Sequence, residues 1–260
     1  SSIWKATELV AEEKASAVVS AGNTGASMAA ALFILKPVKG IDRPAIAAIF
    51  PSLKDQVIIV DVGANVDCKP RHLFQFAVMG DVYAKRIFGR TKPRIGLLSN
   101  GEESSKGNEL TKESHKILKE SPLNFIGNVE GKDIFKGDTD VIVCDGFDGN
   151  VVLKTSEGLS EAIFHLLKIE IGNAPWYQKI GYPLLKPSFA RFKKRVDYSE
   201  YGGAPLLGVN GVSMICHGRS TSKAIKNAIG RAKSLVENQV NSHIQKEIEA
   251  FPISEHTQSQ

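Results

Sequence analysis

The chain has 260 residues, of which 42% are hydrophobic and 23% charged, so it is long enough to bury a substantial core. No segment approaches the roughly 18 consecutive apolar residues that a membrane-spanning helix needs, and the three cysteines share no close spacing, which argues against a zinc site. The net charge of +5 favours an anionic partner, and nucleic acid, an acidic protein, anionic lipid and phosphate all meet that condition.

Five short apolar runs each end in a small turn rich in glycine and amide side chains. They begin at Val18, Val57, Ile95, Val141 and Val212. An uninterrupted Val/Ile run bounded by Gly or Asp predicts a strand buried on both faces, as in a parallel sheet covered by helices. Ligands of open α/β sheets bind at the carboxyl ends of such strands. We therefore expect the functional residues in these five turns, gathered at one edge of the sheet.

Helices are predicted between the strands. Residues 1–14 have an amphipathic helical pattern, and residues 220–251 carry an apolar stripe that predicts one long helix or two helices closing the fold. The alternation of strands and helices predicts a three-layer α/β/α sandwich in a single domain over 1–260, with a flexible tail over 252–260. Other helices are expected over about 24–35, 70–88, 107–120 and 155–171, and short strands near 44–50 and 125–127.

Residues 175–200 stand apart as an amphipathic helical excursion. Pro183 and Pro187 are expected to divide it into short helices, with large apolar side chains on one side and cations on the other. One interpretation is a helical insertion that packs on the body or on a second subunit, and the other is contact with an anionic membrane. The side chains expected at the membrane are Trp176, Tyr177, Leu184, Leu185, Phe189, Lys193 and Lys194.

Two turns carry the residue types of an anion site. The first places small residues and backbone amides at the start of a helix, and its members are Gly22, Asn23, Thr24 and Gly25. In the second, Lys106 precedes Gly107 and Asn108 at the mouth of a helix, where a cation is unfavourable unless an anion binds. The structural alternatives are a tight turn for the first and a solvated lysine for the second.

The densest polar turn follows the run at Val141. Asp145 and Asp148 can orient a lysine, bind a metal or cap the following helix, and Asn150, after Gly149, can stabilise an oxyanion. Asn65 belongs to a weaker companion group after the run at Val57. A divalent metal held by Asp61, Asp145 and Asp148 fits the residue types, but no spacing demands it.

Together these motifs resemble the bacterial phosphate acyltransferase (PlsX) family of phospholipid synthesis. Members of that family usually begin with a further strand-and-helix segment that carries an Asp-Ala-Met-Gly-Gly-Asp type turn, and this chain starts after it. The matches run in the expected order: SAGNTGA at 20–26, DVGAN at 61–65, KGNELTK at 106–112, DGFDGNVVLK at 145–154 and YGGAPLLGVNGVSMICHG at 201–218.

The resemblance implies an isocitrate/isopropylmalate dehydrogenase-like fold and a homodimer in the cytoplasm with peripheral membrane contact. It implies transfer of a long-chain acyl group from acyl carrier protein to inorganic phosphate, giving acyl phosphate, and it makes nucleic acid an unexpected partner. Phosphate would attack the thioester directly, with Lys106 neutralising phosphate charge and Asn150 stabilising the oxyanion. Asn23, Asn108 and Asp148 would orient the substrate or the lysine, and no metal, redox cofactor or covalent enzyme intermediate is needed.

Two other functions are compatible with the same residue patterns. A metal- and NAD(P)-dependent dehydrogenase of the same fold would need an arginine-rich carboxylate pocket and an aspartate triad on helix ends, and the sequence shows neither clearly. A non-catalytic module that binds carrier protein or membrane is the third interpretation.

Overall fold

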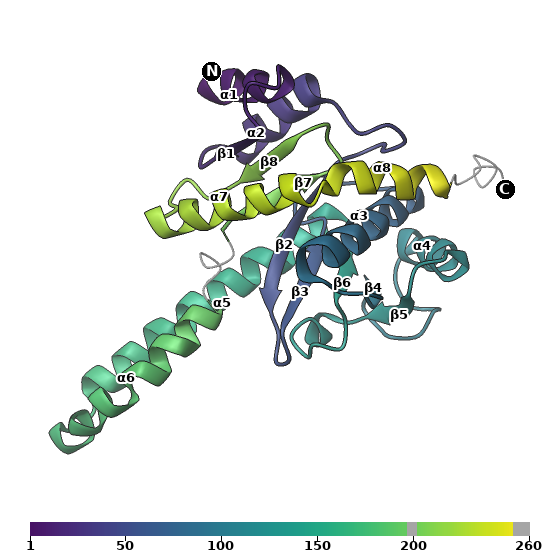
Figure 1. The fold of residues 1–260 in the computed structure, drawn as a ribbon. Helices are drawn as coiled ribbons and strands as arrows, with labels where there is room; N and C mark the ends of the chain where they lie inside the picture. The colour runs from purple at the N-terminus through teal and green to yellow at the C-terminus, as the bar shows by residue number, and fades with distance from the viewer. Residues whose placement is uncertain (197–201, 252–260) are drawn as a thin grey trace.

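The computed structural model describes residues 1–196 and 202–251, so the expected tail over 252–260 and the end of the expected excursion lie outside the described residues. At its centre is one eight-stranded sheet in the order β1-β8-β7-β2-β3-β6-β4-β5 (Figure 1). Its strands are β1 (Ala17–Ser20), β2 (Ala45–Pro51), β3 (Gln56–Val60), β4 (Ile95–Leu98), β5 (Phe125–Val129), β6 (Val141–Val143), β7 (Ala204–Leu207) and β8 (Val212–Ile215).

The strands do not all run in the same direction. Four pairings are parallel, namely β1 with β8, β3 with β6, β6 with β4 and β4 with β5. The three pairings β8–β7, β7–β2 and β2–β3 are antiparallel, so β1 and β8 run opposite to β3. The reason is that the connections over 52–55 and 208–211 are too short for a parallel crossover.

This topology corrects the expectation that all five turns meet at one edge. The turns after β3, β4 and β6 share an edge, whereas strand direction puts the turns after β1 and β8 at the opposite edge. Strand β7, which the sequence patterns did not predict, separates the two groups because it pairs antiparallel with both β2 and β8.

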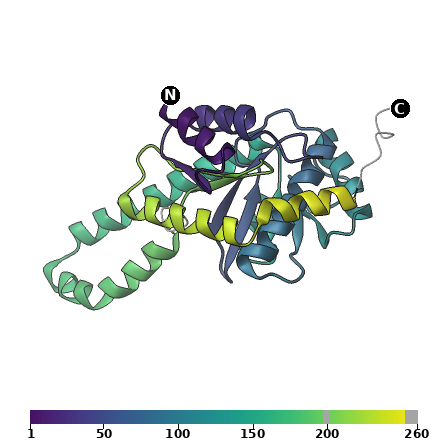
Figure 2. The ribbon, with the colours of Figure 1, turned by 45° about the horizontal axis from the view of Figure 1, so that its top comes forward.

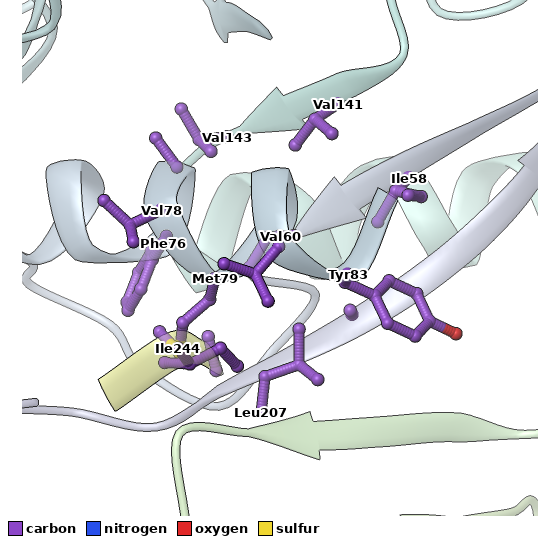
Figure 3. Packing of buried hydrophobic residues seen from close by; sticks show 14 of the residues in the cluster. Ile58, Val60, Phe76, Val78, Met79, Tyr83, Val141, Val143, Leu207 and Ile244 are labelled. Atoms are coloured by element: carbon purple, nitrogen blue, oxygen red, sulfur yellow. The ribbon is translucent and has the colours of Figure 1, made fainter. Parts of the chain in front are cut away.

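Helices cover both faces of the sheet (Figures 1 and 2). On one face, α3 and α8 pack with Phe76, Met79 and Ile244 against Val60 and Val141 (Figure 3). On the other, α1, η1 and α5 cover a second core. The helices are α1 (Ser2–Ala11), α2 (Thr24–Ala30) continuing as a π-helical turn η1 (Ala31–Leu35), α3 (Pro70–Phe88), α4 (Glu109–Glu120), a 3-10 turn η2 (Gly131–Asp133), α5 (Gly146–Asn173), α6 (Trp176–Val196), α7 (Ser222–Glu237) and α8 (Val240–Ala250).

The cores confirm strands buried on both faces and the three-layer α/β/α fold. Along β3, Ile58 and Val60 belong to one core while Val57 and Ile59 belong to the other, because successive side chains of a strand point to opposite faces. An uninterrupted apolar run is the pattern that such a strand needs.

The long helices differ from expectation at two points. Helix α5 begins at Gly146 rather than near 155, so the predicted polar turn is in fact its first turn. Helix α6 continues through Pro183 and Pro187 instead of dividing there, and its Phe192 lies 5.7 Å from Phe164 of α5 between ring centroids. The two helices leave the body side by side as a pair (Figures 1 and 2).

Arg94 and Asp140 tie the start of β4 to the start of β6. The Arg94 amide and Nε donate to Asp140 Oδ2 at 2.8 and 2.9 Å, and Nη2 donates to Oδ1 at 3.1 Å. Burial raises the pKa of Asp140, but the hydrogen bonds and charge of Arg94 outweigh it and hold the pKa below its ordinary value.

Arg94→Ala is expected to lower the free energy of unfolding by about 2 kcal/mol near neutral pH, less than for a fully buried pair because the Arg94 side chain is 38% exposed. A lowered folded-state pKa means that the pair stabilises the fold above the unfolded-state pKa, and that this contribution is lost as pH falls through the folded-state pKa. Urea unfolding at about pH 7 and pH 3 measures it. If the difference in unfolding free energy between wild type and variant is as large at pH 3 as at pH 7, the stabilising role assigned to the Arg94–Asp140 pair is wrong.

Candidate active site

The turn after β3 is organised by the buried carboxylate of Asp61. It accepts five hydrogen bonds of 2.7–3.2 Å, from the backbone amides of Ile46, Gly63, Ala64 and Asn65 and from the Asn65 side chain. Burial raises the pKa of Asp61, and these donors oppose the rise. Asn65 also donates to the Pro44 carbonyl at 2.8 Å. Both residues therefore shape the loop.

The metal site considered from the sequence finds no support in this geometry. Both oxygens of Asp61 are used within its own turn, which leaves Asp145 and Asp148 without it. Within residues 1–196 and 202–251, no group of three or more His, Cys, Asp or Glu side chains is arranged to hold a metal ion.

Two glycines allow the first turn of α5 to pack directly on this loop. A Cβ at Gly146 would lie 2.2 Å from the Asn65 carbonyl oxygen, and one at Gly149 would lie 1.8 Å from that of Asp61. The Gly146 amide donates to the Asn65 carbonyl at 2.8 Å, and the Gly149 amide donates within the helix to Asp145 at 2.9 Å. Gly149 is buried and forms part of the floor of the site.

Asn150 lies over this floor. A Cβ at Gly63 would lie 3.4 Å from Asn150 Oδ1, so the asparagine side chain crosses the glycine closely. The residue is exposed, and its side chain has no hydrogen-bond partner within the described part of the chain. Its amide is free to meet a ligand.

The carboxylates and thiols beside Asn150 are not ready nucleophiles. Asp145 caps α5 by accepting from the Phe147 amide at 2.7 Å, and partial burial followed by the charge of Asp145 raises the pKa of Asp148. Burial, then Asp145, raises the pKa of Cys68 to about 12, and burial raises that of Cys144 well above its ordinary value. Both thiols are therefore protonated near neutral pH, when only a thiolate would attack.

The loop after β4 presents Lys106 at the same sheet edge. Gly107 has φ +91°, which favours glycine, and its amide donates to Asn100 Oδ1 at 2.8 Å. Asn108 caps α4 by accepting from the amide and hydroxyl of Thr111, both at 2.9 Å. Lys106 is exposed, and its ammonium group has no ion-pair or hydrogen-bond partner among the residues that the structure describes.

The turn over Gly22–Gly25 lies at the other edge of the sheet. Asn23 caps α2 by accepting from the Ala26 amide at 2.9 Å, and Gly22, Thr24 and Gly25 are exposed. Helix α2 and η1 run from there toward the β3 turn, where Met28 and Leu32 line a cavity of about 220 Å³ with Asn65. The structure thus gathers Asn65, Asp145, Asp148, Gly149 and Asn150 at one edge with the Lys106 loop, and sets the Gly22–Gly25 turn apart from them.

Sequence patterns missed an apolar groove of about 710 Å³ along α5. Its walls come from α5, the β2–β3 hairpin and the segment after η2. One signal in the sequence could have indicated it. Helix α5 carries more large apolar residues, among them Leu159 and Ile163, than one buried helix face accommodates.

Comparison with known proteins identifies relatives of the chain. Residues 1–243 match a family model described as "Fatty acid synthesis protein". The chain is 58% identical over 253 residues to a phosphate acyltransferase from Pelotomaculum thermopropionicum, covering 97% of this chain and 74% of the relative. It is 59% identical over 254 residues to one from Geotalea uraniireducens, covering 97% and 73%.

Solved structures show the same architecture. A phosphotransacetylase from Streptococcus pyogenes matches with a TM-score of 0.55 at 18% identity, covering 93% of this chain and 66% of that one. EutD phosphotransacetylase from Staphylococcus aureus gives a TM-score of 0.52 at 16% identity, covering 96% and 67%. These two phosphotransacetylases therefore share the fold of this chain. The chain belongs to the fatty acid synthesis protein family and is similar to relatives named phosphate acyltransferase.

Proposed function

We propose that the protein is a phosphate acyltransferase that moves a long-chain acyl group from acyl carrier protein to inorganic phosphate. The observation that carries this is that Lys106 and Asn150 follow neighbouring parallel strands at one sheet edge, and that neither side chain has a partner among the described residues. A cation suits phosphate and an amide donor suits the oxyanion of a thioester under attack. Family membership supports the same reaction.

In the proposed reaction an oxygen of hydrogen phosphate attacks the thioester carbonyl. The new C–O bond forms, the C–S bond breaks, and the proton carried by the phosphate leaves with the thiol sulfur. Lys106 holds the phosphate and Asn150 donates to the carbonyl oxygen, while Asn108 and Asp148 orient the reactants. The phosphate site forms without the Gly22–Gly25 turn, which lies at the other edge.

The decisive experiment follows thiol release from hexadecanoyl-acyl carrier protein with and without orthophosphate, with acyl phosphate identified by mass spectrometry. Release that depends on phosphate and yields acyl phosphate is expected. Binding of the carrier protein without release would favour the non-catalytic module. Nicotinamide reduction in the presence of Mg²⁺ and NAD(P)⁺ would favour the dehydrogenase, and either result would overturn the proposal.

Peripheral membrane contact through the outer end of the α5–α6 pair is the second part of the proposal. Trp176 is 75% exposed and Leu184 is 83% exposed, beside exposed Tyr177 and Leu185. Trp176 and Tyr177 begin α6 at the connection between the helices, which is the end farthest from the sheet (Figure 1), and Leu184 and Leu185 follow about 12 Å further along α6. In the described ranges no helix is long and apolar enough to cross a bilayer.

The other predicted membrane residues are placed differently. Phe189 is half-buried and stacks on Tyr182 with ring centroids 6.0 Å apart, and Lys194 is exposed. The side chain of Lys193 lies outside the described residues. A homodimer remains part of the proposal.

The double variant Trp176→Ser/Leu184→Ser is expected to bind anionic vesicles at least tenfold more weakly, because each large apolar side chain contributes about 1.5–3 kcal/mol when buried. Vesicle flotation measures this. Ile229→Ser is the control, since Ile229 is 55% exposed on α7. Unchanged flotation of the double variant would leave a packing role for the tip.

A further inference from the structure

The apolar groove along α5 holds no residue yet assigned a role. Leu53 and Leu159 in its walls are 79% and 59% exposed, although both are large and apolar. Phe192 and Arg195 of α6 stand at its far end, and Arg195 Nη2 donates to the carbonyls of Ser52 and Leu53 at 2.8 Å each. These hydrogen bonds connect α6 to the β2–β3 hairpin, so the two walls of the groove are held together by specific contacts.

The other end of the groove lies beside the candidate active site. Val151, which lines the groove, directly follows Asn150. Gly131 also lines it and precedes Lys132, whose ammonium lies 4.0 Å from Glu102 in the Lys106 loop. This end therefore lies next to both elements that carry the proposed catalytic side chains.

We propose that this groove binds the alkyl chain of the acyl donor, with the thioester carbonyl at Asn150. The inference rests on the proposed function. The groove extends from Val151 to Ile163 of α5, about 18 Å at the helical rise, which suits an extended long-chain acyl group and greatly exceeds a short one. Its lining is mostly aliphatic and aromatic, so the transfer of a methylene chain from water into the groove is favourable in free energy.

Two small residues of α5 allow the position of the acyl chain along the groove to be tested by substitution. Ser156 and Ser160 line the groove at about 8 and 14 Å from Val151 along the helix. A tryptophan at either position fills the groove beyond that point. Each methylene kept out of the groove weakens binding about fourfold, so exclusion of two lowers kcat/KM about 15-fold.

The experiment measures kcat/KM for acyl-acyl carrier protein donors from eight to eighteen carbons with orthophosphate. Ser160→Trp is expected to lower the hexadecanoyl-to-octanoyl ratio at least tenfold, and Ser156→Trp to move the cut-off to shorter chains than Ser160→Trp does. Leu166→Trp, on the same helix beyond the groove, is expected to keep the wild-type ratio. Wild-type ratios in both serine variants would overturn the proposal.

Two further measurements separate this inference from the proposed function. Calorimetric titration with hexadecanoate and octanoate reports groove binding without turnover, and only the hexadecanoate affinity should fall in Ser160→Trp. If wild type releases no thiol from any donor, the proposed function fails while this titration still decides the groove. If light scattering shows that Ser160→Trp changes the oligomeric state and leaves the chain-length ratio unchanged, the groove is a contact between copies and the proposal is wrong.

Discussion

Lys106→Ala is expected to lower kcat/KM for orthophosphate by about 10²- to 10³-fold, the usual loss when one preorganised electrostatic donor is removed. The ammonium group has no partner in the described part of the chain, so its loss disturbs no internal hydrogen bond or ion pair. The Lys106 side chain passes close to Gly101, where a Cβ would lie 2.7 Å from Lys106 Cγ. Steady-state kinetics with varied orthophosphate measures the loss.

Lys116→Ala is the matched control, because Lys116 is exposed on α4 and carries the same charge. It should keep wild-type kinetics, which separates the local effect from a change in net charge. A folded Lys106→Ala protein with an unchanged rate would remove Lys106 from the mechanism.

Gly149→Ala is expected to destabilise the protein by about 3 kcal/mol or more, at the upper end of overpacking effects. The added Cβ would lie 1.8 Å from the Asp61 carbonyl oxygen, and a backbone atom cannot turn aside as a side chain does. The first turn of α5 must then move away from the β3 turn, carrying Asn150 with it. Urea unfolding measures the loss of stability, and acyl phosphate synthesis should fall with it.

Gly158→Ala is the control on the same helix, and its expected effect has the opposite sign. No heavy atom of the described residues lies within 4 Å of a Cβ at Gly158. Alanine is favoured over glycine in a helix interior by about 1 kcal/mol, so this variant should be more stable than wild type. Equal stabilities of the two variants would show that α5 does not pack on Asp61 as described.

Much of the fold could be predicted from local patterns. The apolar runs that became β3 and β6 indicated burial on both faces, and the two cores confirm it. Helix α3 spans the predicted 70–88, with Pro70 at its first position and Gly89 at its end. Such signals need only neighbouring residues, which is why they can be recognised without the tertiary structure.

The start of α5 could not be predicted in the same way. Glycine has poor helix propensity, so Gly146 and Gly149 indicated a turn. Both are helical because only glycine permits the close approach to Asn65 and Asp61, and those contacts join residues that are far apart in the sequence. Tertiary packing overrides local propensity at this point.

By itself the sequence determined most of the strands and helices and the turns that hold Lys106 and Asn150, because apolar periodicity and capping act over a few residues. Only the tertiary structure decided that β1 and β8 run opposite to β3, that the Asp61 carboxylate is hydrogen-bonded within its own loop, and that an apolar groove begins at Val151. Each of these depends on which distant segments pair and pack, and short-range patterns do not encode that choice.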